Sequence, residues 1–91
     1  MSYKLVFTKS YEKKLLKFLR KNRNLVEKYE KTIYILEKNP FHPSLRLHKL
    51  SGKLRDFHSV SIDMSYRIVI DFIIEDEKII PINIGSHDEI Y

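Results

Sequence analysis

Apolar and polar positions along the chain predict one strand, two helices and then three strands. Segment 3–7 alternates and is rich in strand-forming residues, so it predicts a short first strand. Apolar residues then recur at helical spacing over 11–22 and again in a second stretch that runs to about Lys38. Pro40 and Pro43 prevent this stretch from continuing. The pattern therefore predicts a hairpin of two amphipathic helices.

The start of the second helix is marked by Asn24, whose side chain suits the free backbone N–H groups of a first turn. Glu27, three residues later, completes the capping pattern. The residues expected to be buried are, in the first helix, Tyr11, Leu15, Phe18 and Leu19 and, in the second, Val26, Tyr29, Ile33 and Leu36.

The second half of the chain predicts a sheet. The basic segment 44–55 has a turn signal at Ser51-Gly52 and is interpreted as a loop. Three strands follow, over residues 57–62, 66–73 and 79–84. Their short connections require antiparallel neighbours. The expected fold is α+β: a single domain over residues 1–91 with an N-terminal strand, a two-helix hairpin and a three-stranded antiparallel meander, with the helices on one sheet face.

Side-chain alternation separates the two faces of this sheet. We expect the helices to cover the apolar face, which holds Val60, Ile62, Tyr66, Ile68, Ile70, Phe72, Ile80, Ile82 and Ile84. The other face is too polar for a core and holds Phe57, Ser59, Ser61, Arg67, Val69, Asp71, Pro81, Asn83 and Gly85. We expect this second face to be open to solvent and to be the working surface.

The net charge of +5 is distributed unevenly. Residues 1–58 carry 15 Lys or Arg against 5 Asp or Glu, whereas residues 59–91 carry 2 against 7, giving +10 and −5. A basic stretch in a small domain is typical of phosphate binding. A solvated helix surface is the alternative explanation.

Several kinds of chemistry are excluded by the residues that are missing. The chain contains no cysteine, which excludes a thiolate nucleophile and cysteine-ligated zinc and suits a reducing compartment. The 4 histidines form no HxH or HExxH pair, and neither a GxSxG elbow nor a GxxxxGK loop is present. The apolar runs are short, so we expect neither a membrane span nor a signal peptide. We expect no metal and no small-molecule cofactor.

The histidines are candidates for proton transfer, because imidazole titrates near neutrality. His48 lies in the basic loop with Lys49, Lys53 and Arg55, and His87 follows the last strand. His42 lies in a proline-flanked turn, where a solvated residue is the simpler explanation. His58 shares the parity of the apolar face, which favours a structural role.

Arg67 lies in the middle of a predicted strand, on the polar face. One interpretation is an ion pair with Asp71 or Asp63. The other is that its permanently charged guanidinium binds a phosphate and stabilises the charge that develops in a transition state.

The element order, the loop His48-Lys49-Leu50-Ser51-Gly52, the strand 66–70 and the ending Gly85-Ser86-His87-Asp88-Glu89-Ile90-Tyr91 resemble the RelE/ParE superfamily of toxins, in particular its YafQ-like branch. The resemblance covers nearly the whole chain. It implies a RelE-like fold and a ribosome-dependent mRNA interferase of a type II toxin–antitoxin system, acting in the cytoplasm. The implied partners are a cognate antitoxin, mRNA and the ribosome, including its 16S rRNA.

The resemblance assigns site residues one by one. His48 matches the loop histidine of the YafQ-like pattern, while His87 and Tyr91 match its terminal histidine and aromatic residue. Arg67 matches a strand arginine of RelE-like and YoeB-like members. Lys49, Lys53 and Arg55 are expected to bind RNA phosphates.

The chain also departs from the YafQ-like pattern. Without gaps, the second histidine and the aspartate of that pattern fall on Ser61 and Ser65, so Ser61 is taken as a substrate-binding candidate. A short gap would bring His58 or Asp63 into those places.

The implied reaction is metal-independent attack of the ribose 2′-hydroxyl on the adjacent phosphate. His48 and His87 would transfer protons in an order left open, Arg67 would bind the phosphate and Tyr91 would stack on or orient a base. Two alternatives remain: a ParE-like inhibitor of DNA gyrase, and a nucleic-acid-binding module without catalysis.

Overall fold

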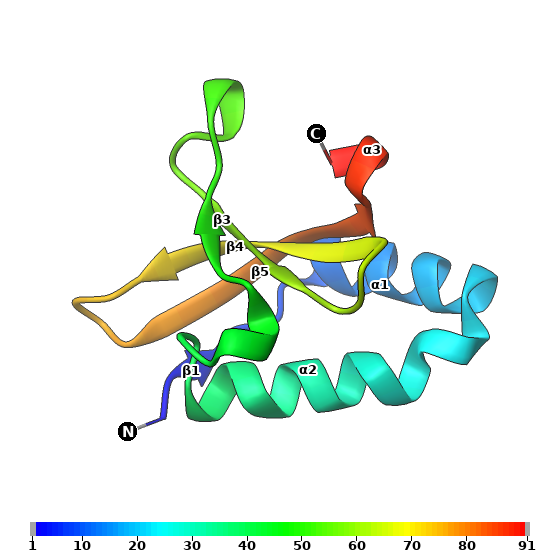
Figure 1. The fold of residues 1–91 in the computed structure, drawn as a ribbon, viewed down its shortest axis with the longest axis horizontal. Coiled ribbons are helices and arrows are strands. Elements are labelled where there is room, and N and C mark those ends of the chain that lie inside the picture. The colour runs from blue at the N-terminus through cyan, green and yellow to red at the C-terminus, as the bar shows by residue number, and fades with distance from the viewer. Residues whose placement is uncertain (1, 91) are drawn as a thin grey trace.

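A mixed sheet of five strands, in the order β1-β5-β4-β3-β2, organises the molecule (Figure 1). The computed structural model describes residues 2–90. The strands are β1 Lys4–Leu5, β2 His48–Lys49, β3 His58–Ser61, β4 Tyr66–Ile73 and β5 Lys78–Ser86. The helices are α1 Lys9–Lys21, α2 Val26–Lys38 and α3 His87–Ile90, with short 3-10 helices η1 Arg23–Leu25, η2 Pro43–Leu45 and η3 Gly52–Leu54. The predicted α+β class is confirmed.

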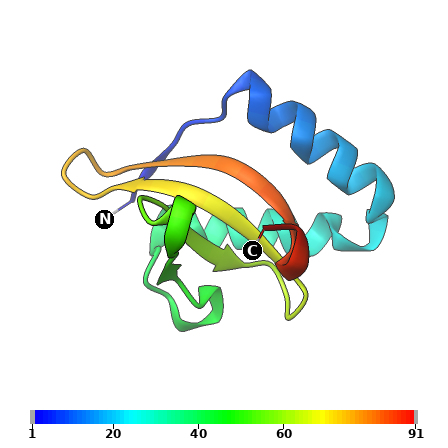
Figure 2. The ribbon, with the colours of Figure 1, turned by 90° about the horizontal axis from the view of Figure 1, so that it is seen from above.

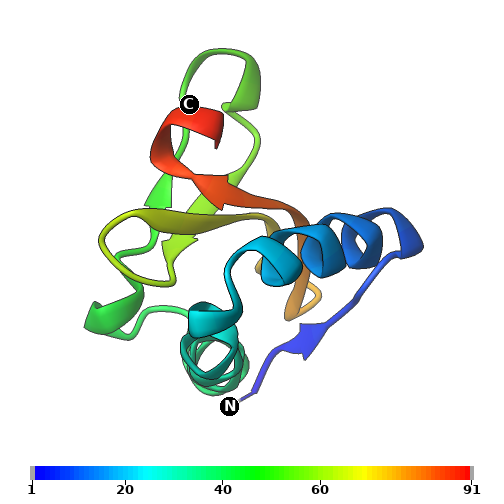
Figure 3. The same ribbon diagram turned by 90° about the vertical axis from the view of Figure 1, so that its right-hand side faces the viewer.

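Helices α1 and α2 pack on one face of the sheet, here called the covered face, while α3 and η3 lie on the opposite side, here called the cavity face (Figure 3). The main core lies under the helix pair. It includes fully buried Tyr11 and Leu36 from the helices and Val60, Ile68 and Ile70 from the strands. Burial of these apolar side chains is the main force that holds the helices on the sheet.

The helix boundaries follow local capping chemistry. The Thr8 hydroxyl accepts a hydrogen bond from Tyr11 N at 3.1 Å, so α1 begins at Lys9 as an N-cap at this position predicts. The prediction that Asn24 caps the second helix is wrong. η1 leads the chain directly into α2, whose first turn has no side-chain cap.

The predicted buried stripe of the second helix is confirmed at Tyr29 and Leu36 and is wrong at its other two positions. Leu25, Tyr29, Thr32 and Leu36 are buried, whereas Val26 and Ile33 are only half-buried. Leu25 belongs to η1, so the buried stripe begins one residue before α2.

The basic segment 44–55 is not simply a loop, because it contains β2. His48 pairs with Ser59 and Lys49 pairs with His58, which makes β2 an edge strand antiparallel to β3. At the other edge, β1 pairs in parallel with β5, since α1 and α2 connect it to the remaining strands.

A bulge in β5 changes the predicted sheet faces. Val69 pairs with Asn83 and Ile70 with Pro81, so Ile82 is an extra residue in β5. Residues of β5 before the bulge therefore lie on the face opposite to the one that simple alternation predicts. Ile79 is buried in the main core, and Ile82 itself packs on the cavity face. The predicted faces of Ile80, Ile82 and Pro81 are wrong for this reason.

The cavity face is also less open than the alternation predicts. Leu50, Val69 and Ile90 are buried there in a small second cluster, with Leu54, Phe57 and Ile82 packed against it. Viewed from above, η3 and α3 lie over the strands (Figure 2). Within residues 2–90, no helix is long and apolar enough to cross a membrane.

Candidate active site

A cavity of about 770 Å³ opens between segment 48–54 and α3. It is lined by His48, Lys49, Leu50, Ser51, Gly52, Lys53, Leu54, His87 and Ile90. Its base is the small apolar cluster of the cavity face, and its polar rim carries histidines and lysines. The structure thus brings the predicted His48 and His87 to one cavity, although β3, β4 and β5 separate them in the sequence.

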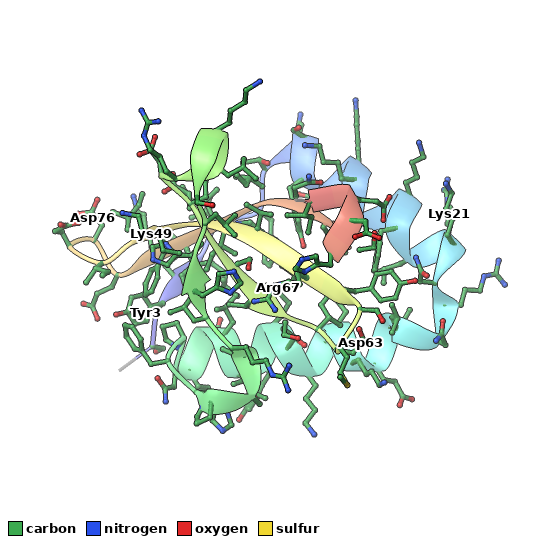
Figure 4. The ribbon with its side chains drawn as sticks, turned by 45° about the horizontal axis from the view of Figure 1, so that its top comes forward. Tyr3, Lys21, Lys49, Asp63, Arg67 and Asp76 are labelled. Carbon is green, nitrogen blue, oxygen red and sulfur yellow. The ribbon has the colours of Figure 1, made fainter. Side chains whose placement is uncertain are left out.

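Arg67 lies in the centre of the cavity face, between the β2 segment and α3 (Figure 4). Its Nε donates to Ser59 Oγ at 2.8 Å, and its Nη2 donates to the carbonyl of Arg46 at 2.9 Å. Nη2 also lies 3.4 Å from the Ser59 carbonyl and 3.2 Å from His48 Nδ1. The alternative that Arg67 pairs with Asp71 or Asp63 is therefore wrong for the described part of the chain.

The contact with Arg67 also constrains the tautomer of a neutral His48 ring. A guanidinium nitrogen only donates, so Nδ1 of His48 must accept in this hydrogen bond. The neutral ring then carries its proton on Nε2. The register of β2 places His48 beside Ser59 on the cavity face, while the next residue, Lys49, pairs with His58.

His87 is the first residue of α3, a short helix that the sequence analysis did not predict. Ser86 Oγ accepts from Glu89 N at 3.2 Å, and Glu89 Oε1 accepts from Ser86 N at 2.9 Å, which is a reciprocal capping box. Hydrogen bonding of the Glu89 carboxylate to the backbone and side chain of Ser86, with a smaller contribution from Lys21, lowers the pKa of the Glu89 carboxyl. His87 N donates to the Ser65 carbonyl at 3.1 Å, so α3 is also joined to the β3–β4 turn.

Arg46 has a left-handed backbone, with φ 48° and ψ 47°. This conformation is costly for a residue with a side chain. It ends η2 and turns the chain toward β2, so that the Arg46 carbonyl meets Arg67. A strained residue whose carbonyl contacts a candidate catalytic arginine fits the tendency of such conformations to occur at functional sites.

The predicted phosphate-binding residues surround the cavity unequally. Lys49 and Lys53 line it, and both are exposed. Arg55 follows η3 and is exposed but does not line the cavity. Gly52 opens η3 with φ 65°, a conformation that favours glycine and allows the tight turn above the cavity.

His58 belongs to the covered face, as its parity predicted. Its ring packs edge-on against Phe72 at 5.7 Å, and its Nδ1 is buried without a hydrogen-bond partner among the described residues. Burial, followed by the nearby charges of Lys49 and His48, lowers the pKa of His58. The structure therefore does not bring His58 to the cavity.

Three other candidates also lie away from the cavity lining. The Ser61 hydroxyl, predicted to bind substrate, donates to the Asp63 carbonyl, and Ser61 is buried near α2. Asp63 accepts from Ser65 N and Tyr66 N at 2.8 and 2.9 Å and so shapes the β3–β4 turn, away from Arg67 (Figure 4). Exposed His42 caps η2 by accepting from Ser44 N at 3.1 Å. Tyr91 lies outside the described residues.

The arrangement suits acid–base chemistry on a phosphate. Imidazole side chains and lysines line one cavity, and the Arg67 guanidinium, which is not part of the lining, contacts the lining residue His48. Among residues 2–90, no three His, Cys, Asp or Glu side chains gather as a metal site would require.

Sequence reasoning missed the groups that support Arg67. Ser59, whose side chain is fully buried, was grouped with an exposed polar face, and the carbonyl of Arg46 has no sequence signature. The capping box of α3 was readable as Ser86-His87-Asp88-Glu89, because Ser-x-x-Glu marks a helix start.

Comparisons with known proteins identify the fold and the family. A family model described as a bacterial toxin of type II toxin–antitoxin systems, YafQ, matches residues 3–91. YafQ from Escherichia coli strain BL21(DE3) has a TM-score of 0.78 with this chain, at 12% identity over 98% of each chain. The E. coli DinJ–YafQ toxin–antitoxin complex gives a TM-score of 0.76 at 14% identity, covering 100% of this chain and 99% of that one.

A toxin from Helicobacter pylori, solved as a copper-bound mutant, is 27% identical over 100% of both chains, with a TM-score of 0.66. No curated protein matches the sequence. The resemblance to YafQ-like toxins that the sequence predicted is confirmed, and the solved structures confirm a RelE-like fold.

Proposed function

Because this chain belongs to the YafQ family of toxins of type II toxin–antitoxin systems, we propose that it is a ribosome-dependent, metal-independent endoribonuclease that cuts mRNA and so inhibits translation. The observation that carries the proposal is the contact of Arg67 with His48 beside the cavity that His48 and His87 both line. A phosphate bound there would meet a positive charge and groups able to transfer protons.

The proposed reaction is an internal transesterification of RNA. The ribose 2′-oxygen bonds to the adjacent phosphorus while a base takes its proton, and the bond from phosphorus to the 5′-oxygen breaks. An acid then gives a proton to the departing 5′-oxygen. The products are a 2′,3′-cyclic phosphate and a free 5′-hydroxyl, and the step consumes no water or cofactor.

Each site residue takes a role suited to its chemistry. Arg67 stabilises the negative charge that develops on the phosphate oxygens, because a guanidinium is positively charged and can donate hydrogen bonds to them. His48 and His87 carry the proton transfers. In the geometry of the free protein, His48 presents its Nε2–H as a donor, since Nδ1 faces Arg67. Tyr91 is proposed to stack on or orient a base.

The lysines of the cavity rim are proposed to add affinity for RNA. Lys49 and Lys53, with Arg55 beside them, are proposed to bind phosphates of mRNA and of 16S rRNA. Such contacts release counterions, so binding should weaken as salt rises and depend little on base sequence.

The proposed regulator is a cognate antitoxin that binds this toxin in the cytoplasm, where translating ribosomes are found. The support is the match to the YafQ family and the similarity to a chain of the DinJ–YafQ toxin–antitoxin complex. An acidic, amphipathic segment that folds on binding suits the exposed helix pair and the basic cavity rim.

Growth arrest combined with primer extension on a reporter mRNA tests the proposal. Wild-type protein should stop growth and produce new 5′ ends inside the translated region, whereas His87→Ala should produce neither. His42→Ala is the matched control, because it removes an exposed histidine that only caps η2. It should behave like wild type.

Two outcomes would contradict the nuclease. Arrest with DNA damage and intact mRNA would indicate a gyrase inhibitor. Salt-sensitive binding to ribosomes with intact mRNA and normal growth would indicate a binding module without catalysis.

A further inference from the structure

The guanidinium of Arg67 is held by groups that its proposed catalytic role does not include. Ser59 Oγ accepts a hydrogen bond from Arg67 Nε at 2.8 Å, and the Arg46 carbonyl accepts one from Arg67 Nη2 at 2.9 Å. With Nη2 also in contact with His48 Nδ1, the Nε and Nη2 edge is occupied by the protein. Among the described residues, Nη1 makes no hydrogen bond with protein groups.

Ser59 differs from an ordinary surface serine. It is 0% exposed, it belongs to a central part of the sheet, and its carbonyl lies 3.4 Å from Arg67 Nη2. A buried hydroxyl beside a charged donor forms a charge-assisted hydrogen bond, which is stronger than a neutral one. Arg46 contributes to the same cradle through a left-handed backbone, a conformation that persists only when the surroundings enforce it.

We propose that Ser59 is a positioning residue, which with the Arg46 carbonyl holds Arg67 so that Nη1 is the nitrogen presented to the phosphate. This inference rests on the proposed function. The fixed edge has a second effect: Nη2 stays against His48 and keeps the proton of the neutral imidazole on Nε2. Ser59 thus acts on the reaction through Arg67, and it need not touch RNA.

The first experiment measures single-turnover cleavage of mRNA on programmed ribosomes. Ser59→Ala should lower the maximal rate by about tenfold to a hundredfold, because a small misplacement of a catalytic group has effects of this size. The toxin concentration giving half of the maximal rate should change by less than about twofold. On an Arg67→Ala background, Ser59→Ala should change the rate by less than about twofold, since residues that act through one another are not additive.

Two further variants show whether the rate depends on the position of the Arg67 guanidinium, on its charge alone, or on the loss of any buried hydroxyl. Arg67→Lys keeps the charge but loses the Nε donor to Ser59, so its rate should fall close to that of Arg67→Ala. Thr32→Val is the matched control: it also removes a buried hydroxyl, which bonds to the Lys28 carbonyl in α2, and it should keep the wild-type rate.

The second experiment does not depend on activity. Solvent exchange of the Arg67 Nε–H, followed by NMR in the free protein, should be faster in Ser59→Ala than in wild type or Thr32→Val. Unchanged exchange, a wild-type rate in Ser59→Ala or Arg67→Lys, or an equal loss on the Arg67→Ala background would overturn the inference. Failure of the proposed function has a different sign: wild type and Arg67→Ala would then cleave mRNA at the same rate.

Discussion

The two faces of β4 are built on different principles. Ile68 and Ile70 point into a large apolar core between the sheet and the α1–α2 pair, whereas Val69, between them, belongs to a cluster of three buried residues. Beside Val69, the cavity face also buries Ser59 and holds Arg67 by hydrogen bonds. The structure of one face is therefore determined by burial of apolar side chains, and that of the other mainly by hydrogen bonds between polar groups.

The difference indicates where stability and function reside. Long helices cover the first face, while η3 and α3, only three and four residues long, cover part of the second. Short segments contribute little apolar burial, so their positions depend on turns and caps. We expect changes on the covered face to act mainly on folding and changes on the cavity face mainly on the site.

The largest expected effect is on the covered face. Ile68→Ala removes a side chain that is 0% exposed in the main core, so it should lower the free energy of unfolding by about 2–5 kcal/mol. Urea denaturation monitored by circular dichroism measures this. A loss below about 1 kcal/mol would show that the core under the helices does not dominate stability.

A smaller effect is expected from Leu50→Ala on the cavity face. Leu50 is 6% exposed in the small cluster, where neighbours can close over the space, so the loss should lie near the lower end of the same range, about 2 kcal/mol. The same denaturation experiment compares it with Ile68→Ala. Equal losses for the two variants would remove the distinction between the faces.

The capping box of α3 should have a local effect. Ser86→Ala removes the hydroxyl that accepts from Glu89 N, and should destabilise α3 by about 0.5–2 kcal/mol. Hydrogen exchange of the Glu89 amide should become faster while exchange in β4 stays slow. Uniformly faster exchange would instead indicate that α3 unfolds only with the whole domain.

The smallest expected effect is pH dependence from His58. The pKa of His58 is lowered in the folded protein, so the unfolded chain binds the proton more tightly. Stability should be unaffected well above the unfolded pKa of about 6.5 and should fall as the pH drops through that value toward the folded pKa. His58→Leu should flatten this part of a stability–pH curve; an unchanged curve would contradict the shift.

The sequence predicted the covered face better than the cavity face, for a physical reason. Long amphipathic helices and alternating strands repeat their signal over many residues, and the helix pair and the β3–β4–β5 meander follow from it. The edge strand β2 has two residues and a basic sequence, so its pairing with β3 leaves almost no periodic signal.

The errors in face assignment have a single local cause. The bulge at Ile82 inverts the parity of the residues before it, and alternation alone does not reveal an inserted residue. Pro81, next to the bulge, is the available signal, because proline within a sheet is found at edges and bulges.

The candidate site was predicted in part. Motif residues His48 and His87 do line one cavity, which sequence separation alone does not reveal. Ser59 and the Arg46 carbonyl were missed because the first looks like an exposed serine in the alternation and the second depends on a left-handed backbone at a non-glycine residue.

The proposed function rests on Arg67, His48 and His87 cutting mRNA by internal transesterification. The most direct test is to follow a reporter mRNA on programmed ribosomes with purified wild type and Arg67→Ala, and to analyse the chemistry of the new ends. We predict 5′-hydroxyl and cyclic phosphate ends, with a rate about a hundredfold to a thousandfold lower for Arg67→Ala. New ends carrying a 5′-phosphate, or equal rates for the two proteins, would contradict the account.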